Sequence, residues 1–333
     1  MKKQNIILLA LFLILGSATA WYLAKAGEKK SSDSWERAFA VPDIGRVHKI
    51  FIADRRGNTT TLERSGKGWI YQGKYPANPH VMKELLHTIQ RLEIYYLPAK
   101  AAVPTMVNDL ATRGIKVELY DRNDNKLKAY YLGSSTADGV GTYAIMENSE
   151  HPYVVYNPSI RGSIVGLFML RGDDWRDKTV IREEPGQITY VSIEYPKQQN
   201  QSFVLERKGE GQYEVRPFYD FTPRIDKQLN RSVVEHYLQG FRQIGAEAYE
   251  NALKEERKES ILSSLPFAVI TIHNEGGKET ILRLFPIETE VDRRPDGTTA
   301  IVERYHVDWN GQDLMLMQHN LLKKILWGYP SFF

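Results

Sequence analysis

The chain has no cysteine among its 333 residues. Disulfide bonds, thiolate metal sites, cysteine nucleophiles and the lipidated cysteine of a lipoprotein are therefore excluded. The chain also has no large excess of positive or negative charge. It contains 44 lysines and arginines and 41 aspartates and glutamates, which gives a net charge of +3. A nucleic-acid surface must neutralise many phosphates, so we expect no nucleic-acid partner.

Charge is also missing from residues 4–24, an apolar run that begins QNIILLALF. At about 1.5 Å per residue, a helix of this length crosses a hydrocarbon layer of about 30 Å. Trp21 and Tyr22 lie where interfacial aromatic residues are expected. We therefore predict a transmembrane anchor or signal-anchor at residues 1–24, which contacts the lipid bilayer through residues 4–24. The alternative is a secretory signal peptide that is cleaved after Ala20.

Either interpretation predicts that the rest of the chain is exported. Residues 25–43 are polar, charged and rich in serine, a composition typical of a linker. Beyond this segment the composition is that of a globular protein, since the whole chain is 42% hydrophobic and 26% charged. The length allows two domains, each with a core of its own.

An internal repeat organises this body. The phrase LERSGKGW, which begins at Leu62, returns almost unchanged as LERKGEGQY from Leu205. A predicted hairpin also recurs, and its alignment places Val117 on Val269. Several echoes in the same order indicate a duplicated structural unit rather than a catalytic motif. The other echoes are IGRVHKIFI and PGQITYVSI, at residues 44–52 and 185–193, and GTYAIME and GTTAIVE, at residues 141–147 and 297–303.

Each copy also predicts helices among its strands. Asn78 and Pro79 are typical of a helix start, and a matching amphipathic helix is expected near residues 230–245. Each copy then predicts a short helix, at residues 104–112 or 252–264, and a closing helix, at residues 160–170 or 314–327. The predicted fold is α+β, with two tandem repeated domains of antiparallel strands and packed helices at residues 44–178 and 184–330.

The first copy resembles a bacterial family catalogued as domain of unknown function 4340. The resemblance depends on a strand that contains Trp69, a helix entry that contains Ala77, and the later sequence in which Leu132 and Gly133 precede Gly141, Thr142 and Tyr143. It is fainter in the second copy, where Tyr213 replaces the tryptophan and Phe285 replaces the glycine. No catalytic residues are attached to this family.

The resemblance implies a location and a class of function. Members are typically exported and tethered by one amino-terminal segment, so we expect a single-pass protein of the bacterial inner membrane with its body in the periplasm. The expected function is a binding or scaffold protein with a membrane-protein partner, as an accessory subunit of an envelope complex such as an ABC-type transport or gliding-associated system. A periplasmic ligand-binding or glycan-binding module and an envelope-polymer hydrolase are the alternatives.

Local motifs do not assemble into a catalytic or metal site. The run Asp121, Asn123 and Asn125 resembles the start of a calcium loop but lacks its glycine and its closing glutamate, so a hairpin turn is predicted. His80 and His87 share a helix face without an evident third ligand. Two further pairs, Glu63 with Glu206 and Ser134 with Ser135, lack a partner base or a nucleophile motif. We predict no catalytic residues, no metal and no cofactor.

Aromatic residues give the remaining functional prediction. The chain has 19 tyrosines and 6 tryptophans, and such amphipathic side chains are enriched at interfaces. Two aromatic runs, YYLPAK and FYDFTP, stand out from the expected core. We predict that they form an interaction surface that includes Tyr95, Tyr96, Phe218, Tyr219 and Phe221.

Overall fold

The structure is a computed structural model that describes residue 17 and residues 35–66, 68–287 and 302–333. The chain divides into two compact units, the first ending at Asp177 and the second beginning at Lys178. The predicted anchor at residues 4–24 lies outside the described residues, apart from Ser17. None of the helices described here is long and apolar enough to cross a bilayer.

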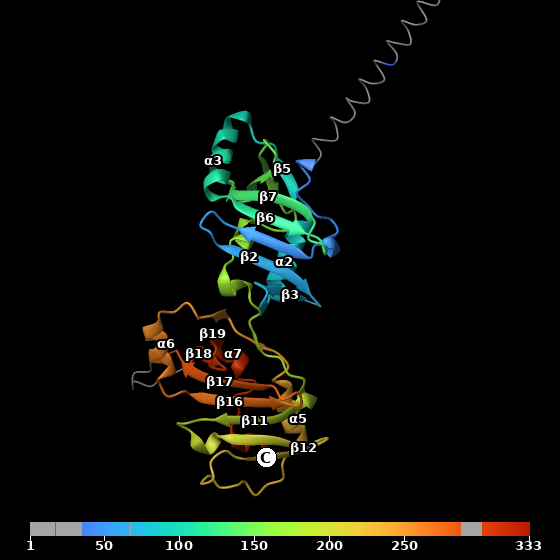
Figure 1. Ribbon diagram of the computed structural model, residues 1–333. Coiled ribbons are helices and arrows are strands. Elements are labelled where there is room, and N and C mark those ends of the chain that lie inside the picture. The colour runs from blue at the N-terminus through green and yellow to red at the C-terminus, as the bar shows by residue number, and fades with distance from the viewer. Residues whose placement is uncertain (1–16, 18–34, 67, 288–301) are drawn as a thin grey trace, which may run out of the picture. The chain divides into compact units, whose positions relative to one another are not determined.

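The first unit is built on a nine-stranded antiparallel sheet with the order β4-β3-β2-β1-β6-β7-β8-β9-β5. Neighbouring strands are mostly joined by short hairpins, while β5 reaches the far edge beside β9 (Figure 1). The strands are β1 Lys49–Ala53, β2 Thr59–Ser65, β3 Gly68–Tyr71, β4 Tyr75–Pro76, β5 Glu93–Tyr96, β6 Ile115–Tyr120, β7 Lys126–Ser135, β8 Thr142–Met146 and β9 Tyr153–Tyr156.

The second unit contains an eight-stranded antiparallel sheet with the order β13-β12-β11-β16-β17-β18-β19-β15. Apart from β4, every strand of the first sheet has a counterpart at the same place in this order. A separate pair is formed by β10 and β14. The strands are β10 Thr179–Ile181, β11 Ile188–Glu194, β12 Phe203–Gly209, β13 Gln212–Pro217, β14 Ile244–Gly245, β15 Ala248–Tyr249, β16 Ala268–Asn274, β17 Glu279–Pro286, β18 Arg304–Trp309 and β19 Asp313–Gln318. The predicted α+β class with antiparallel sheets is confirmed.

One face of each sheet carries the main core and an amphipathic helix. In the first unit, α2 (Pro79–Gln90) begins where the Asn78 side chain accepts hydrogen bonds from the backbone of His80 and Val81. In the second, the Asn230 side chain caps α5 (Arg231–Gln239) in the same way. Short helices α4 (Val165–Phe168) and α7 (His319–Leu322) contribute Phe168 and Leu322 to the respective cores. Each large apolar side chain buried in this way contributes about 1.5–3 kcal/mol.

The opposite face of each sheet carries a second helix, and here the two units differ. Helix α3 (Val103–Arg113) approaches β7 so closely that a Cβ added to Gly133 would lie 2.5 Å from an Asp109 carboxylate oxygen. In the second unit, Phe285 occupies the ladder position of Gly133 and is buried with Ile261 of α6 (Glu255–Leu262). In the second unit, the Phe285 side chain therefore fills the space that α3 occupies against β7 in the first unit.

The strand pairing corrects two features of the proposed alignment. Ile52 pairs with Val117 in the first sheet, and Ile193 pairs with Ile270 in the second, so Val117 corresponds to the buried Ile270 and not to Val269. The counterpart of β8 is likewise β18, because Leu132 pairs with Ala144 and Leu284 pairs with Val307. The segment 141–147 therefore does not match 297–303, most of which lies outside the described residues. Hydrophobic similarity misplaced both segments because it does not fix the register of a strand.

The chain segments at the two ends of the body also differ from expectation. The segment 314–327 was predicted as a helix, but it begins within β19, and only His319–Leu322 is α-helical. Within the expected linker at 25–43, Phe39 is fully buried and packs against the rings of Tyr130 and Tyr153. At the carboxyl end, Phe332 is fully buried, so the apolar terminus docks on its own unit.

Candidate functional site

Two predicted interface residues lie together on strand β5, which forms one edge of the first sheet. Tyr95 is 39% exposed, Tyr96 45% and the following Leu97 56%. The Tyr95 ring lies 5.2 Å from the Tyr96 ring and 4.9 Å from that of Tyr156 on β9. We call Tyr95, Tyr96 and Leu97 the β5 aromatic edge. Exposed apolar side chains grouped in this way are typical of a binding surface.

The other three predicted residues form a cluster in the second unit. Tyr219 stacks on Phe221 at 5.2 Å and contacts Phe218 at 5.1 Å. Its hydroxyl donates a hydrogen bond to Glu194 at 2.5 Å, and burial together with this carboxylate raises the pKa of Tyr219 to about 12. Phe221 is 69% exposed. These rings extend from a loop that follows β13, so they do not offer a free strand edge.

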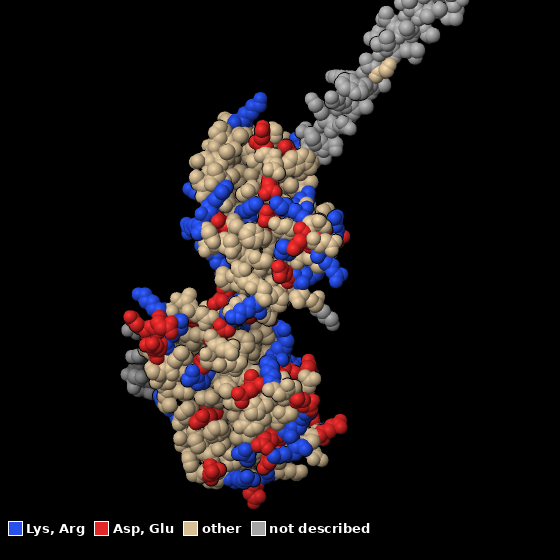
Figure 2. Space-filling model, in the orientation of Figure 1, with Lys and Arg blue, Asp and Glu red and all other residues tan. Residues whose placement is uncertain are grey.

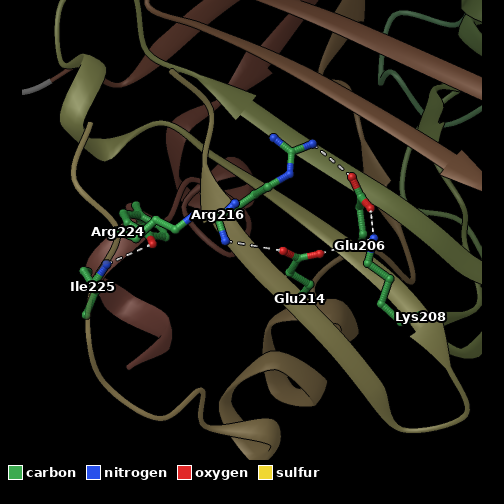
Figure 3. Close-up of polar contacts among 7 residues, drawn as sticks. Glu206, Lys208, Glu214, Arg216, Arg224 and Ile225 are labelled. Carbon is green, nitrogen blue, oxygen red and sulfur yellow. Dashed lines mark hydrogen bonds and ion pairs between the residues drawn. The ribbon is translucent and has the colours of Figure 1, made fainter. Parts of the chain in front are cut away.

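The other strand edges of the two sheets carry features that oppose pairing. Strand β4 contains Pro76, which has no backbone N–H to donate. In the second sheet the edge strand is β13, which lies beside β12. Figure 3 shows Glu206 of β12 and Glu214 of β13 among three basic side chains. The basic side chains are those of Lys208, Arg216 and Arg224. Charge along an edge strand discourages the addition of another strand.

The strand that corresponds to β5 is β15, and it is short and surrounded by polar contacts. Tyr96 pairs with Val154 on β9, and at the equivalent place Ala248 pairs with Leu316 on β19. Beside β15, the Glu250 carboxylate lies 2.6 Å from His306 Nδ1. Glu247 forms an ion pair with Arg304 at 2.9 Å. The aromatic edge of the first unit thus has a polar counterpart.

The recurring carboxylates Glu63 and Glu206, which were not predicted to be catalytic, lie opposite or against basic residues in the described structure. Glu206 accepts charge-assisted hydrogen bonds from Lys208 and Arg216, which lower its pKa. Glu63 is exposed and lies on β2 opposite Lys49. Within the described residues there is no group of three histidine, aspartate or glutamate side chains placed to hold a metal ion.

The suspected calcium loop is a hairpin turn. The Asp121 carboxylate accepts hydrogen bonds from the backbone N–H groups of Asn123 and Asn125 and from the Asn125 side chain. Asp124 adopts a positive φ of 61°, as such a turn requires. The carboxylate is occupied by its own loop, so the predicted turn is confirmed.

A charged network crosses β6, β7 and β8. Glu118 binds Lys116 at 2.8 Å and Lys126 at 3.0 Å, and it accepts a hydrogen bond from Tyr120. Burial alone would raise the pKa of Glu118, but these partners outweigh it and lower the pKa to about 2. Glu147 joins the same two lysines. Because each charge is matched, the network is suited to stabilising the sheet rather than to transferring protons.

A cavity of about 730 Å³ opens in the first unit where β1 and β7 end and β2 begins. Ile52, Tyr71 and Phe168 provide part of an apolar wall, while Thr60 and Ser134 provide hydroxyl groups. Its volume lies in the range of sites for small molecules. The sequence motifs gave no indication of this cavity, because its lining comes from segments far apart in the chain.

Charged residues at this cavity are mainly arginines. Four of them, Arg55, Arg56, Arg113 and Arg171, line it together with two aspartates, Asp54 and Asp174. The Arg171 guanidinium is paired with Asp54, whereas that of Arg113 lies 3.8 Å from Asp109. Within the described part of the chain, the Arg56 guanidinium has no carboxylate partner.

Ser134 has a structural role at this cavity. Its hydroxyl donates a hydrogen bond to Asp109 at 2.7 Å, and its backbone N–H donates another to the same carboxylate. These bonds attach α3 to the end of β7. The Asp109 carboxylate thus holds both the hydroxyl and the backbone of Ser134 in place.

Elsewhere on the face shown in Figure 2, acidic and basic side chains are interspersed over both units. His80 is exposed and His87 half-buried on α2, and the described residues give them no third ligand. The two candidate binding sites are thus both in the first unit: the β5 aromatic edge and the arginine-lined cavity.

Comparison with known proteins identifies a family. A family model described as "Domain of unknown function (DUF4340)" matches residues 98–264, and the chain belongs to this family. The match includes Gly133 but not Trp69 or Ala77, and it spans parts of both units. Neither curated proteins nor solved structures gave a match.

Proposed function

We propose that this DUF4340 protein is a binding protein without catalytic activity, and that a partner polypeptide docks on the β5 aromatic edge. The observation that carries the proposal is the exposure of Tyr95 and Tyr96 on β5, and of Leu97 directly after it, since β5 has only one neighbour in the sheet. The other sheet edges carry proline, ion pairs or a very short strand. An exposed aromatic strand edge favours aggregation, so its presence here supports a docking role.

The partner would add to the sheet as a further strand. Backbone hydrogen bonds would give affinity, while the rings of Tyr95 and Tyr96 would select alternate apolar side chains of the incoming segment. The neighbouring Tyr156 already supports the Tyr95 ring at 4.9 Å, so the surface is partly organised before binding. Such preorganisation reduces the entropy that association costs.

The proposal places this surface outside the cytoplasm. The apolar run at 4–24 would anchor the chain in the bacterial inner membrane, and the body would lie in the periplasm as an accessory subunit of an envelope complex such as an ABC-type transport or gliding-associated system. In this account the two units are tandem copies of one fold, an origin supported by their common strand order. The second copy would serve mainly as a scaffold.

Site-specific photo-crosslinking of the full chain in its native envelope tests the docking surface. A photoreactive residue at Tyr96 is expected to capture one discrete membrane-protein partner, while the same residue at Ala248, the matched edge position of the second unit, captures none. Adding a Tyr95→Lys substitution to the same chain should abolish the adduct at position 96. Equal adducts at both positions, or an adduct unaffected by Tyr95→Lys, would overturn the proposal.

Anchoring and export are tested separately. The full chain should remain with the membrane after alkaline carbonate extraction, and protease added to spheroplasts should digest the body. Release of the chain by carbonate, or protection of the body until the membrane is lysed, would contradict the proposed location.

A further inference from the structure

We propose that the arginine-lined cavity of the first unit binds a small organic anion, a carboxylate or phosphate group carried on an apolar body. The cavity is distinct from the β5 aromatic edge, since none of its lining residues belongs to β5. The inference thus adds a ligand site to the proposed docking role. It rests on a comparison of the same corner in the two units and on the chemistry of the lining.

The corresponding corner of the second unit is filled by aromatic rings. Ile52 pairs with Thr60, and the equivalent Ile193 pairs with Phe203, so Phe203 occupies the ladder position of Thr60. Phe203 is fully buried, and its ring lies 4.8 Å from that of Phe332. A side chain that merely lines the cavity in one unit is therefore a core ring in the other.

A second position repeats this contrast. Asp54 follows β1 directly, and Tyr195 follows β11 directly at the same place. Tyr195 is buried, contacts the Phe267 ring at 5.6 Å and donates a hydrogen bond to the backbone of Trp327 at 2.9 Å. In the second unit, aromatic side chains thus fill the corner that corresponds to the cavity. In the first unit, small and polar side chains leave it open.

The charges around the cavity select the ligand. Asp54 is already engaged, since it accepts hydrogen bonds from Asn58 and from the backbone of Arg56 and pairs with Arg171. The Arg56 guanidinium has no carboxylate partner within the described residues, and that of Arg113 is 75% exposed with Asp109 at 3.8 Å, so both can turn toward a ligand. Arginine guanidinium groups bind carboxylate and phosphate oxygens through paired hydrogen bonds, so an anion is the complementary ligand.

The apolar wall implies that the anion is attached to a hydrophobic body. Phe168 and Ile52 are buried, while Met169 at the cavity is 53% exposed. Small-ligand sites commonly combine such a wall with a few polar groups that fix orientation. Inorganic phosphate alone would contact the arginines and leave this wall unused.

Calorimetric titration of the full chain in a neutral detergent tests the site with three probes. Naphthyl phosphate carries both the anion and the apolar body, naphthyl glucoside has the same body with a neutral head, and inorganic phosphate has the anion alone. We expect saturable binding of naphthyl phosphate at one site per chain, and at least tenfold weaker binding of each of the other two. Equal affinity for the glucoside, or no saturable binding, would overturn the proposal.

Two variants locate the binding in the cavity. Thr60→Phe introduces the ring that the second unit carries and should abolish binding. Arg56→Gln combined with Arg113→Gln removes two charges from exposed side chains and should weaken binding about tenfold or more. This double variant keeps the test decisive if Thr60→Phe does not fold. Unchanged affinity in the folded variants would contradict the assignment.

Arg224→Gln provides a matched control in the second unit. The Arg224 side chain is 71% exposed and lies 3.8 Å from Glu214, much as that of Arg113 is 75% exposed and lies 3.8 Å from Asp109. This control should leave the affinity unchanged, and an equal loss there would point to general charge attraction and overturn the site. Competition with a short-chain phosphatidate then separates the sources of an anion. Displacement at lower concentrations than naphthyl phosphate requires would support a lipid headgroup, and displacement only at higher ones would support a soluble anion.

Discussion

The two units have the same strand order, yet they differ at one corner and at one edge. In the first unit the corner beside Thr60 is a cavity of about 730 Å³, whereas Phe203 fills that place in the second. The edge strand β5 exposes aromatic rings, whereas β15 lies among ion pairs. The same fold thus closes the corner and surrounds the edge with charges in only one unit, and this difference supports our proposal that the open corner and the exposed edge of the first unit bind other molecules.

The largest expected effect comes from opening the filled corner. Phe203→Thr removes a fully buried ring that packs against Phe332 and Tyr237. It should destabilise the second unit by about 4 kcal/mol, because a cavity is left in a packed core. Hydrogen exchange of β11 and β12 would measure the loss. The exposed Phe221→Thr is the control, with an expected change of about 0.5 kcal/mol or less, and similar effects of the two would show that the corner is not tightly packed.

The next largest effect concerns the close approach of α3 to its sheet. Gly133→Val would place a Cβ 2.5 Å from Asp109 and 3.2 Å from Leu110. We expect a loss of about 2 kcal/mol from overpacking, with faster hydrogen exchange in α3. Gly166→Ala is the matched control, because no atom lies within 4 Å of an added Cβ there. Unchanged exchange in Gly133→Val would show that α3 can move away freely.

A similar or smaller effect should follow from loss of the Glu118 network in the first unit. In the folded protein the pKa of the Glu118 carboxyl is about 2, below its ordinary value of 4.5. A lowered carboxylate pKa contributes stability that is present above the unfolded value and lost as the pH falls from about 4.5 toward 2. Glu118→Gln should therefore cost on the order of 2 kcal/mol at pH 7 and much less at pH 2. Urea unfolding across this range would measure it, and a cost independent of pH would contradict the assignment.

The smallest effect on stability is expected at the aromatic edge itself. Tyr96→Lys replaces a side chain that is 45% exposed, so the free energy of unfolding should change by about 0.5 kcal/mol or less. Partner capture should nevertheless be lost. Urea unfolding of the purified variant supplies the first measurement and crosslinking the second. A large loss of stability would instead assign Tyr96 a structural role.

Much of the fold was predictable because it follows local rules. The Asn78 cap, the strand containing Leu62 and the hairpin at Asp121 depend on residues close in sequence. The pairing of Ile52 with Val117 was not predictable to the residue, since similar apolar patterns fit a strand in neighbouring registers. The closing helix predicted from residue 314 was wrong because an apolar run fits a buried strand equally well.

The candidate sites show the same division. Exposure of Tyr95 and Tyr96 was anticipated from a local aromatic run. The cavity was not, because Thr60, Ser134 and Arg171 come from separate segments and meet only in the folded unit. A strand-by-strand comparison could have suggested it, since Thr60 aligns with Phe203 once the paired phrases from Leu62 and Leu205 are superimposed.

The most direct test of the contrast between the units compares photo-crosslinking at two equivalent edge positions of the full chain. The account predicts a discrete partner adduct from position 96 on β5 and none from position 248 on β15. An adduct from position 248 alone, or the same adduct from both positions, would contradict the claim that the first unit carries the docking surface.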